Sequence, residues 1–329
     1  MSGLPGPLRL QPVFLTKPWA ADQLPGPLGQ ALQPPPRTGE VWLASDRLQV
    51  TPIADGEQVG LGLDLALARW PDYILGPGRT GPCPLLVKLL NVGQWLSVQV
   101  HPDDQAARRL EQEPWGKSEA WHILAAGPGA QMIHGLALGV DRAGLERALA
   151  QGRLPEALAK VPVQAGETYL VPAGTVHAPG PGLLMFEVQQ ASDVTYRFYD
   201  WDRLGDDGRP RPLHQAKALA VMQATGPGRP TPPRPLSGPP LERVLLAQDP
   251  HFRLLRCRLT GQADLPAQEG LSLLFVLQGQ GRLSFPGGQH PAQELAPGQS
   301  WLLPAGLAPA RLQASAEGII YLESLASGG

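Results

Sequence analysis

The sequence predicts a mainly β protein built from two jelly rolls. Gly (39) and Pro (38) together fill nearly a quarter of its 329 positions, well above the usual share of roughly 12%, so we expect many turns and few long helices. Residues 96–101 (LSVQVH) alternate strictly between apolar and polar, as half-buried strands do. A short strand between glycines, ended by Pro-x-Gly, occurs at 166–174 and again at 298–306. Such a corner suits two small antiparallel sheets, and two copies suit two jelly rolls.

A Pro- and Gly-rich segment at 225–240 is the clearest boundary in the chain. Proline has no backbone N–H and a fixed φ angle, so this composition predicts a stiff, extended linker. We therefore expect residues 1–224 to form one unit, with a small helical insertion, and residues 241–329 to form a second jelly roll.

Helical patterns are few, and strand patterns dominate the rest of the chain. Helices are expected near 103–113, 141–160 and 212–224. Asp103 or Asp104 is a typical N-cap for the first helix and Asp141 for the second, while Leu154–Lys160 is expected as a further short helix. The strand candidates are 83–91, 96–101, 119–125, 167–172, 182–190, 194–199, 252–260, 271–277, 281–285, 300–304 and 318–324.

Charge and cysteine content exclude several classes of protein. The net charge of −2 provides no basic surface for nucleic acid or for a membrane. Cys83 and Cys257 are far apart, so neither a disulfide framework nor a thiolate zinc site is indicated. No apolar leader and no run of roughly 18 apolar residues is present, so we expect a cytoplasmic protein. Nothing in the sequence indicates the oligomeric state.

Four polar residues are candidates for a metal site. Gln99 and His101 lie two apart and so share one face of a strand, although an ordinary polar strand face would show the same pattern. Glu119 begins another strand candidate, and His177 follows the first Pro-x-Gly corner. One carboxylate, two imidazoles and a carboxamide oxygen suit a divalent ion such as Zn²⁺. The second copy of the repeat has Pro309 in place of the histidine, so we expect the second unit to be metal-free.

Two further groups of charged residues are unusual. Lys88 and Glu187 each interrupt an apolar run, and an unpaired buried charge costs several kcal/mol, so each should face a polar cavity or a partner. An edge lysine that reaches solvent would be the plainer explanation for Lys88. Asp193, Thr195 and Arg197 alternate onto one strand face, which suits an anionic, hydroxyl-rich ligand. A surface strand with salt bridges is the alternative.

Four blocks of sequence occur in a fixed order: 86–104, 116–121 (GKSEAW), 171–178 (VPAGTVHA) and 196–203 (YRFYDWDR). Together they resemble the type I mannose-6-phosphate isomerases, which are zinc enzymes of the cupin fold. The match is to the short bacterial form, over roughly residues 8–223 and more loosely in the second unit. One departure is visible: Pro18-Trp19-Ala20-Ala21 stands where the family commonly has an aromatic residue, Trp and two glycines.

The resemblance implies a reaction and a set of site residues. It implies one zinc ion per chain, held by Gln99, His101, Glu119 and His177. It makes Arg197 the active-site arginine, with Lys88, Lys117, Ser97, Glu187, Asp193 and, less securely, Glu40 lining the same pocket. The five other histidines match no ligand position and are expected to be structural or exposed: His122, His134, His214, His251 and His290.

The implied reaction interconverts D-mannose 6-phosphate and D-fructose 6-phosphate through a cis-enediol. One base must take and return a carbon-bound proton, and Glu187, Asp193, Lys117 and a hydroxide on the metal are all candidates. Lys117, Lys88 or Arg197 could hold the phosphate. Two other hypotheses remain open, namely another cupin enzyme, such as a dioxygenase or an isomerase of a different sugar, and a non-catalytic sugar-phosphate-binding protein.

Overall fold

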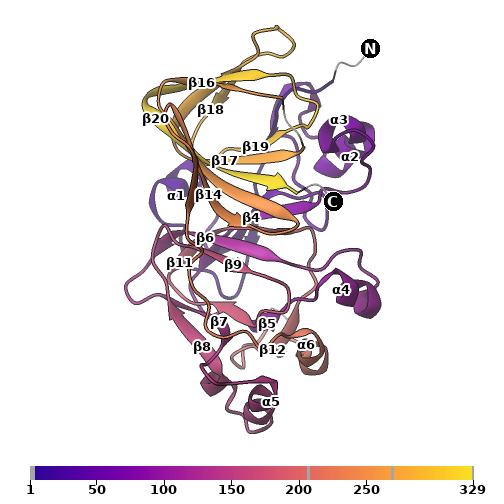
Figure 1. The fold of residues 1–329 in the computed structure, drawn as a ribbon, viewed down its shortest axis with the longest axis vertical. Helices are drawn as coiled ribbons and strands as arrows, with labels where there is room; N and C mark the ends of the chain where they lie inside the picture. Colours follow the sequence, from indigo (N-terminus) through magenta and orange to yellow (C-terminus); the bar gives the residue numbers. More distant parts are fainter. Residues whose placement is uncertain (1–3, 206–207, 268–269, 328–329) are drawn as a thin grey trace.

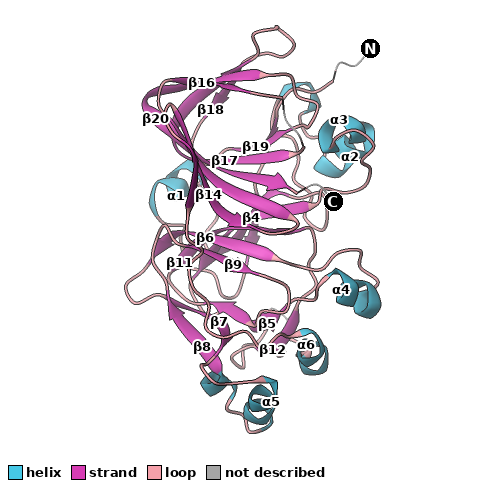
Figure 2. Cartoon of the chain, viewed as in Figure 1, coloured by secondary structure: helices cyan, strands magenta, loops and turns pink. Residues whose placement is uncertain are grey.

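Three antiparallel β-sheets follow one another along the long axis of the molecule (Figure 1). The computed structural model describes residues 4–205, 208–267 and 270–327. The outer ends of the two expected units, at residues 1 and 329, lie outside these ranges. Strand residues far outnumber helical residues, and the helices lie at the periphery (Figure 2), so the mainly β prediction is confirmed.

The six-stranded sheet lies in the middle of the molecule, with the five-stranded sheet on one side and the nine-stranded sheet on the other. The six-stranded sheet has the order β2 (Val13–Thr16), β3 (Thr38–Ala44), β4 (Leu85–Val92), β11 (Leu183–Gln190), β6 (Glu119–Ala126), β9 (Thr168–Val171). The five-stranded sheet has the order β12 (Tyr196–Tyr199), β5 (Val98–Val100), β10 (His177–Pro179), β7 (Gln131–Leu136), β8 (Leu158–Pro162).

The nine-stranded sheet contains the C-terminal unit and one strand from the N-terminus. Its order is β1 (Leu8–Leu10), β19 (Ser300–Leu303), β17 (Ser272–Ser284), β20 (Ala310–Ala326), β15 (Phe252–Leu259), β14 (Leu241–Gln248), β13 (Arg234–Ser237). Two short strands lie off this path: β16 (Gln262–Leu265) pairs with β20, and β18 (Gln293–Leu295) pairs with β17.

The helices are short. The α-helices are α1 (Gly26–Leu32), α2 (Leu63–Arg69), α3 (Pro71–Leu75), α4 (Asp104–Glu111), α5 (Arg142–Ala150) and α6 (Gln215–Val221), and the 3₁₀ turns are Gly56–Gln58 and Leu154–Ala157. No helix in the described ranges is both long enough and apolar enough to cross a membrane.

The middle sheet is covered on both faces, which explains its composition. All eight residues of β4 and all eight of β11 are buried. Leu89 and Phe186 face the nine-stranded sheet, where the ring of Phe186 stacks on Phe275 with centroids 5.9 Å apart. Leu90 and Met185 face the opposite way, into the space between the six- and five-stranded sheets. Polar residues on that second face therefore lie between the six- and five-stranded sheets, a pair of sheets that we call the first barrel.

Two of the expected helix starts are confirmed. The carboxylate of Asp103 accepts a hydrogen bond from the backbone N–H of Ala106 at 2.7 Å, and it caps α4. Asp141 caps α5 in the same way, through the N–H of Gly144 at 2.7 Å. Each cap satisfies one of the N–H groups left without an intrahelical partner at a helix start.

Other local expectations are wrong. The segment 154–160 is a 3₁₀ turn that runs into β8, because pairing with β7 satisfies its backbone better than an isolated helical turn. The helix expected at 212–224 covers only Gln215–Val221. The candidates 271–277 and 281–285 are one strand, β17, which bends near Gly279, a residue in the left-handed region at φ 74°. Helices α1, α2 and α3 carried no pattern that we recognised.

The proline-rich segment is less free than a linker. Two backbone hydrogen bonds join it to the first unit. The N–H of Leu136 donates to the carbonyl oxygen of Thr225 (2.8 Å), and the N–H of Thr231 donates to that of Thr168 (2.7 Å). Residues 234–237 then form β13, which pairs with β14, so this part of the segment belongs to the nine-stranded sheet. The N-terminal strand β1 also pairs within the C-terminal sheet. The division into two units at 225–240 remains a prediction.

Candidate active site

The candidate site lies between the six- and five-stranded sheets and is built around β5. Val98 and Val100 point outward into the apolar core beneath α5 and α6. The alternation therefore directs Ser97, Gln99 and His101 into the barrel, as the sequence predicted. In register, Gln99 lies opposite His177 of β10 on one side and opposite Arg197 of β12 on the other.

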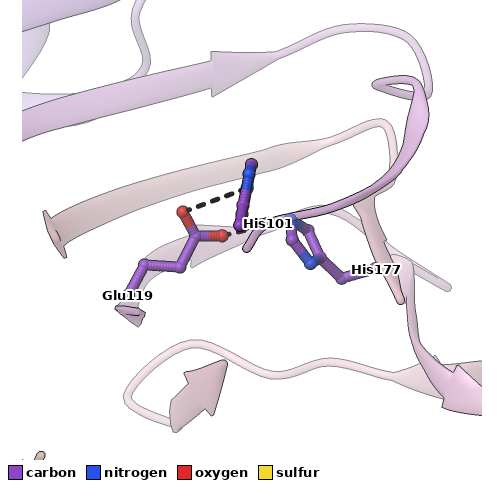
Figure 3. A group of neighbouring side chains, drawn as sticks. All are labelled: His101, Glu119 and His177. Carbon is purple, nitrogen blue, oxygen red and sulfur yellow. Dashed lines mark ion pairs between the residues drawn. The ribbon is translucent and has the colours of Figure 1, made fainter. Parts of the chain in front are cut away.

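Figure 3 shows the centre of the site, where His101, Glu119 and His177 converge. Their ligand atoms all lie within 4.8 Å of one another, and all three residues are buried. Oε1 of Glu119 is 3.2 Å from Nε2 of His177, and Oε2 is 3.7 Å from Nε2 of His101. Three residues separated widely in the sequence thus present one carboxylate and two ring nitrogens to the same point.

Backbone carbonyls fix which ring nitrogen of each histidine faces the carboxylate. Nδ1 of His101 donates to the carbonyl oxygen of Val194 at 2.8 Å, and Nδ1 of His177 donates to that of Thr175 at 2.9 Å. Burial lowers the pKa of His177 to about 3, and burial together with Lys117 lowers the pKa of His101 well below its usual value. Both rings are therefore neutral near pH 7, with their Nε2 lone pairs directed inward.

The donor set fits a divalent metal ion. Both carboxylate oxygens of Glu119 are buried, and neither accepts a hydrogen bond from any residue that the structure describes. Nζ of Lys117 is 3.0 Å from Oε2 of Glu119 and 3.2 Å from Nε2 of His101. Lys117 is thus paired with only one of the two carboxylate oxygens, and a metal ion between Glu119 and the two neutral imidazoles would satisfy both.

Gln99 lies beside this cluster. Its Nε2 is 3.2 Å from Nε2 of His177, and its Oε1 accepts a hydrogen bond from Oγ of Ser97 at 3.1 Å. A half-turn of the amide would present Oε1 to the metal position and direct the NH₂ group toward the same hydroxyl, which can also accept. Ser97 can thus support Gln99 in either orientation.

A buried ion pair forms the next layer of the site. Nζ of Lys88 is 3.1 Å from Oε1 of Glu187, and the two side chains are only 8% and 3% exposed. The other oxygen of Glu187 accepts a hydrogen bond from Nε1 of Trp121 at 2.9 Å. Because β4 lies between β3 and β11, Lys88 is not an edge residue, and the explanation by an edge lysine reaching solvent is wrong.

Glu40 completes this network from β3. It accepts a hydrogen bond from Nε1 of Trp42 at 2.7 Å and pairs with Nζ of Lys17 at 3.2 Å. Burial alone would raise the pKa of Glu40, but Lys88 and Lys17 hold it below its usual value. Burial alone would likewise lower the pKa of Lys88, but Glu187 and Glu40 raise it. This layer therefore carries fixed charges of both signs.

Arg197 lies on β12, opposite Gln99 of β5. Its Nε is buried and has no hydrogen-bond partner among the residues that the structure describes. Burial, and then the nearby charge of Arg211, lower the pKa of Arg197. Its guanidinium group is thus poorly compensated, which makes it a candidate for holding an anion.

Asp193 and Thr195 do not lie on the strand that the sequence predicted. β12 begins at Tyr196, and both residues precede it in a loop, where Oγ1 of Thr195 bonds to the carbonyl oxygen of Asp193 at 3.3 Å. Such local bonds compete with strand pairing, which explains the late start of β12. Asp193 is exposed and lines a cavity of about 240 Å³ together with Trp42 and Leu86.

Trp121 is a site residue that the sequence analysis did not select. Besides its bond to Glu187, its ring contacts the ring of His177 edge-on, with centroids 5.3 Å apart. The signal was available, because Trp121 lies two residues after Glu119 and so shares its strand face.

The remaining histidines lie away from the cluster's ligand atoms. His122 and His134 are buried and bond to Thr168 (2.9 Å) and to the carbonyl of Leu170 (3.0 Å). The backbone N–H of His214 donates a hydrogen bond to the backbone carbonyl oxygen of Arg197 at 2.8 Å. His251 and His290 belong to the C-terminal unit.

The loop at 18–21, where the sequence departs from the family pattern, is well packed. Trp19 is 4% exposed, and its carbonyl oxygen accepts the backbone N–H groups of Gly93 and Gln94 at 2.9 and 3.0 Å. Ala20 forms an isolated bridge with Val92. This loop therefore closes the end of β4 without its usual glycines.

Comparison with known proteins agrees with this geometry. The family model for the catalytic domain of type I phosphomannose isomerase matches residues 21–119. A mannose-6-phosphate isomerase from Streptococcus mutans is 36% identical over 279 residues, covering 84% of this chain and 87% of that protein. The chain belongs to the type I phosphomannose isomerase family. A second relative, a mannose-6-phosphate isomerase from Bacillus subtilis, is 34% identical over 319 residues, covering 95% of this chain and 98% of its own.

Solved structures of phosphomannose isomerases share the fold. The crystal structure of the mannose 6-phosphate isomerase from Bacillus subtilis matches with a TM-score of 0.85 and 29% identity, covering 97% of this chain and 99% of its own. A phosphomannose isomerase from Salmonella typhimurium, at 16% identity, matches with a TM-score of 0.72 over 98% of this chain and 100% of its own. The cupin fold and the family that the sequence predicted are therefore confirmed. Type I phosphomannose isomerases depend on a metal ion, and the cluster in Figure 3 is the candidate site for one.

Proposed function

We propose that the protein interconverts D-mannose 6-phosphate and D-fructose 6-phosphate through a cis-enediol, using one zinc ion per chain. The observation that carries the proposal is the buried cluster of His101, Glu119 and His177, whose ligand atoms all lie within 4.8 Å of one another. Membership of the family supplies the reaction, and the cationic groups around the cluster suit an anionic substrate.

The zinc ligands in this proposal are His101, Glu119, His177 and Gln99. When bound, the ion would act as a Lewis acid toward the oxygens at C1 and C2 of the sugar. Ser97 would hold the amide of Gln99 in its ligating orientation, as its hydrogen bond to that side chain supports.

Proton transfer between C1 and C2 requires a base that is shielded from water. Lys117 and Glu187 are both buried beside the cluster, whereas Asp193 is exposed at the rim. We therefore place proton transfer with Lys117 or Glu187, and we place Asp193 at the opening. Trp121 and Lys88 hold the two oxygens of Glu187, so they fix its orientation.

Arg197 is the residue we assign to the developing negative charge of the enediolate or to the phosphate. Its guanidinium group has a buried Nε without a partner among the described residues, so a substrate oxygen would satisfy it. Lys88 and Glu40 would line the inner wall of the substrate site.

The first experiment measures metal content beside a coupled assay for fructose 6-phosphate made from mannose 6-phosphate. About one zinc per chain, with turnover abolished by a chelator and restored by Zn²⁺, is the expected result. Zinc without turnover would contradict the proposed substrate and favour another sugar or a binding protein. Protein that was never exposed to chelator yet holds no metal would contradict the metal site.

Two variants separate the metal site from the catalytic arginine. Arg197→Ala should keep its zinc and lose about 10²–10³ in kcat, as loss of a charge-stabilising donor does. His177→Ala should lose zinc and activity together. Arg153→Ala, whose side chain is 60% exposed on the surface, is the matched control and should behave as wild type. Full turnover in Arg197→Ala, or normal zinc content in His177→Ala, would refute the respective assignment.

We further propose that the protein works in the cytoplasm, where its sugar phosphates are made. Both cysteines are free and buried, as is usual in a reducing compartment.

A further inference from the structure

The nine-stranded sheet, which we call the second barrel, has interior positions that correspond to those of the candidate site in the first barrel. The sequence repeat aligns Val171 of β9 with Leu303 of β19, each directly before the proline of Pro-x-Gly. Across β9 and β6, Val171 lies opposite Glu119. Across β19 and β17, Leu303 lies opposite Ser272. Ser272 therefore occupies the position that Glu119, the carboxylate of the metal cluster, occupies in the first barrel.

The next strand carries the correspondence further. Trp121 lies two residues after Glu119 and is opposite Glu187 across β6 and β11. Leu274 lies two residues after Ser272 and is opposite Glu323 across β17 and β20. Glu323 is thus the counterpart of Glu187, and the second barrel has kept a buried carboxylate at that position.

The cation paired with Glu323 comes from the strand after next in the sheet, and not from the neighbouring strand as in the first barrel. In the first barrel Lys88 is opposite Glu187, and in the second barrel Leu255 takes its place opposite Glu323. Arg243 of β14 supplies the cation instead, with a nitrogen 2.6 Å from Oε2 of Glu323. The second barrel therefore holds this ion pair beside its apolar core, which includes Leu259, Val276 and Trp301.

Further polar groups surround this pair. Oγ of Ser272 donates to Oε1 of Glu323 at 3.0 Å, and Sγ of Cys257 lies 3.7 Å from Oε2. Burial, followed by the negative charge of Glu323, raises the pKa of Cys257 to about 12. The Arg243 side chain is 36% exposed and that of Glu323 is 7% exposed, so the pair lies between the buried core and the surface.

Arg243 and Glu323 of this cluster line a cavity of about 720 Å³. Its size is in the range of small-molecule sites. The negative charge of Glu323 is balanced by Arg243, and the negative charge of Asp264 is balanced by Arg311, which lies 2.7 Å away. Apolar side chains form much of its wall: Leu236, Leu241, Leu255, Leu265, Leu274, Leu303 and Leu325.

Two arginines of the cavity wall have no such partner. Arg79 and Arg253 line the cavity, and neither has an ion pair or a side-chain hydrogen bond with the described residues. The described groups of the cavity therefore leave an excess of positive charge beside an apolar wall. Guanidinium groups bind carboxylate and phosphate oxygens through paired hydrogen bonds.

We propose that the second barrel binds a small anion with an apolar body. The carboxylate or phosphate group of this ligand contacts Arg79 and Arg253, and its apolar body packs on the leucines of the wall. The site takes no metal, because Ser272 stands where the first barrel has Glu119 and Pro309 where it has His177.

The test is calorimetric titration of the full-length, zinc-loaded protein with n-octanoate, n-octyl phosphate and 1-octanol. At least one of the two anions should bind, and the neutral alcohol should bind at least tenfold more weakly. Preference for octanoate would identify a carboxylate site, and preference for octyl phosphate a phosphate site. Arg253→Gln and Arg79→Gln should each weaken binding of the anion about tenfold or more.

Arg258→Gln is the matched control, because Arg258 is exposed on the opposite face of the same strand as Arg253. It should bind the anion as wild type does, and all three variants should retain their zinc content and isomerase turnover. The proposal is overturned if neither anion binds, if 1-octanol binds equally well, or if both arginine variants bind with unchanged affinity. The last two results would leave only an apolar cavity.

Discussion

Replacement of Lys88 by methionine tests whether the ion pair with Glu187 is truly shielded from water. Methionine keeps most of the aliphatic stem of Lys88 and removes its charge, so packing against neighbouring strands changes little. Two unit charges about 3 Å apart attract by roughly 5 kcal/mol at an effective dielectric constant near 20. Loss of one partner from a buried pair typically costs about 3–5 kcal/mol, because the other charge stays buried without compensation. We expect Lys88→Met to lower the free energy of unfolding by about that amount.

The assay is urea unfolding followed by tryptophan fluorescence, arranged as a double-mutant cycle. Glu187→Gln keeps an oxygen that can accept from Trp121, and the double variant should recover most of the stability lost in Lys88→Met. Lys160→Met is the control, since Lys160 is exposed on β8 and should change stability by less than about 0.5 kcal/mol. A loss below about 1 kcal/mol in Lys88→Met, with no coupling in the cycle, would show that the pair is solvated and would refute the reasoning.

Two other predictions concern stability. Burial lowers the pKa of His122 from 6.5 to about 4. As the pH falls, His122 is therefore protonated in the unfolded chain before it is protonated in the folded protein. About 3 kcal/mol of stability that is present above pH 6.5 should be lost as the pH falls toward 4. His122→Gln should flatten this pH dependence in urea titrations, and an identical pH profile would count against the buried neutral ring. Asp103→Ala removes the cap of α4 and should cost about 1 kcal/mol, whereas exposed Asp22→Ala should cost nothing measurable. Equal unfolding midpoints for these two variants would argue against the cap.

Much of the site could be predicted because its residues lie in strongly patterned strands. The alternation at 96–101 places Gln99 and His101 on one face, and the structure confirms that face as the interior of the barrel. Lys88 and Glu187 were noticeable as charged residues within apolar runs. Each provides the partner that the other needs when buried, with Nζ and Oε1 3.1 Å apart. Their roles in metal binding and catalysis are still proposals.

Other features depend on contacts that a local pattern does not contain. The residues 158–160 join β8 because β7 lies beside them, and no short-range signal distinguishes this from a helical turn. The sequence also did not show that Glu323 and Glu187 occupy corresponding positions, because this correspondence depends on strand pairing. Only the corner at 298–306 repeats in sequence, and the rest of the second site becomes visible through strand register.

The pairing of β1 with β19 also has a consequence for biosynthesis. Leu10 lies opposite Ser300, and Leu8 and Leu10 are almost completely buried beside the C-terminal strands. At about 5–20 residues per second, the ribosome needs roughly 15–60 s to make the chain between these two partners. During that interval the first strand has emerged while the surface it covers does not yet exist. The two ends of the polypeptide can therefore fold together only after translation is nearly complete, and a chain truncated within the last sheet would leave its own N-terminus unprotected.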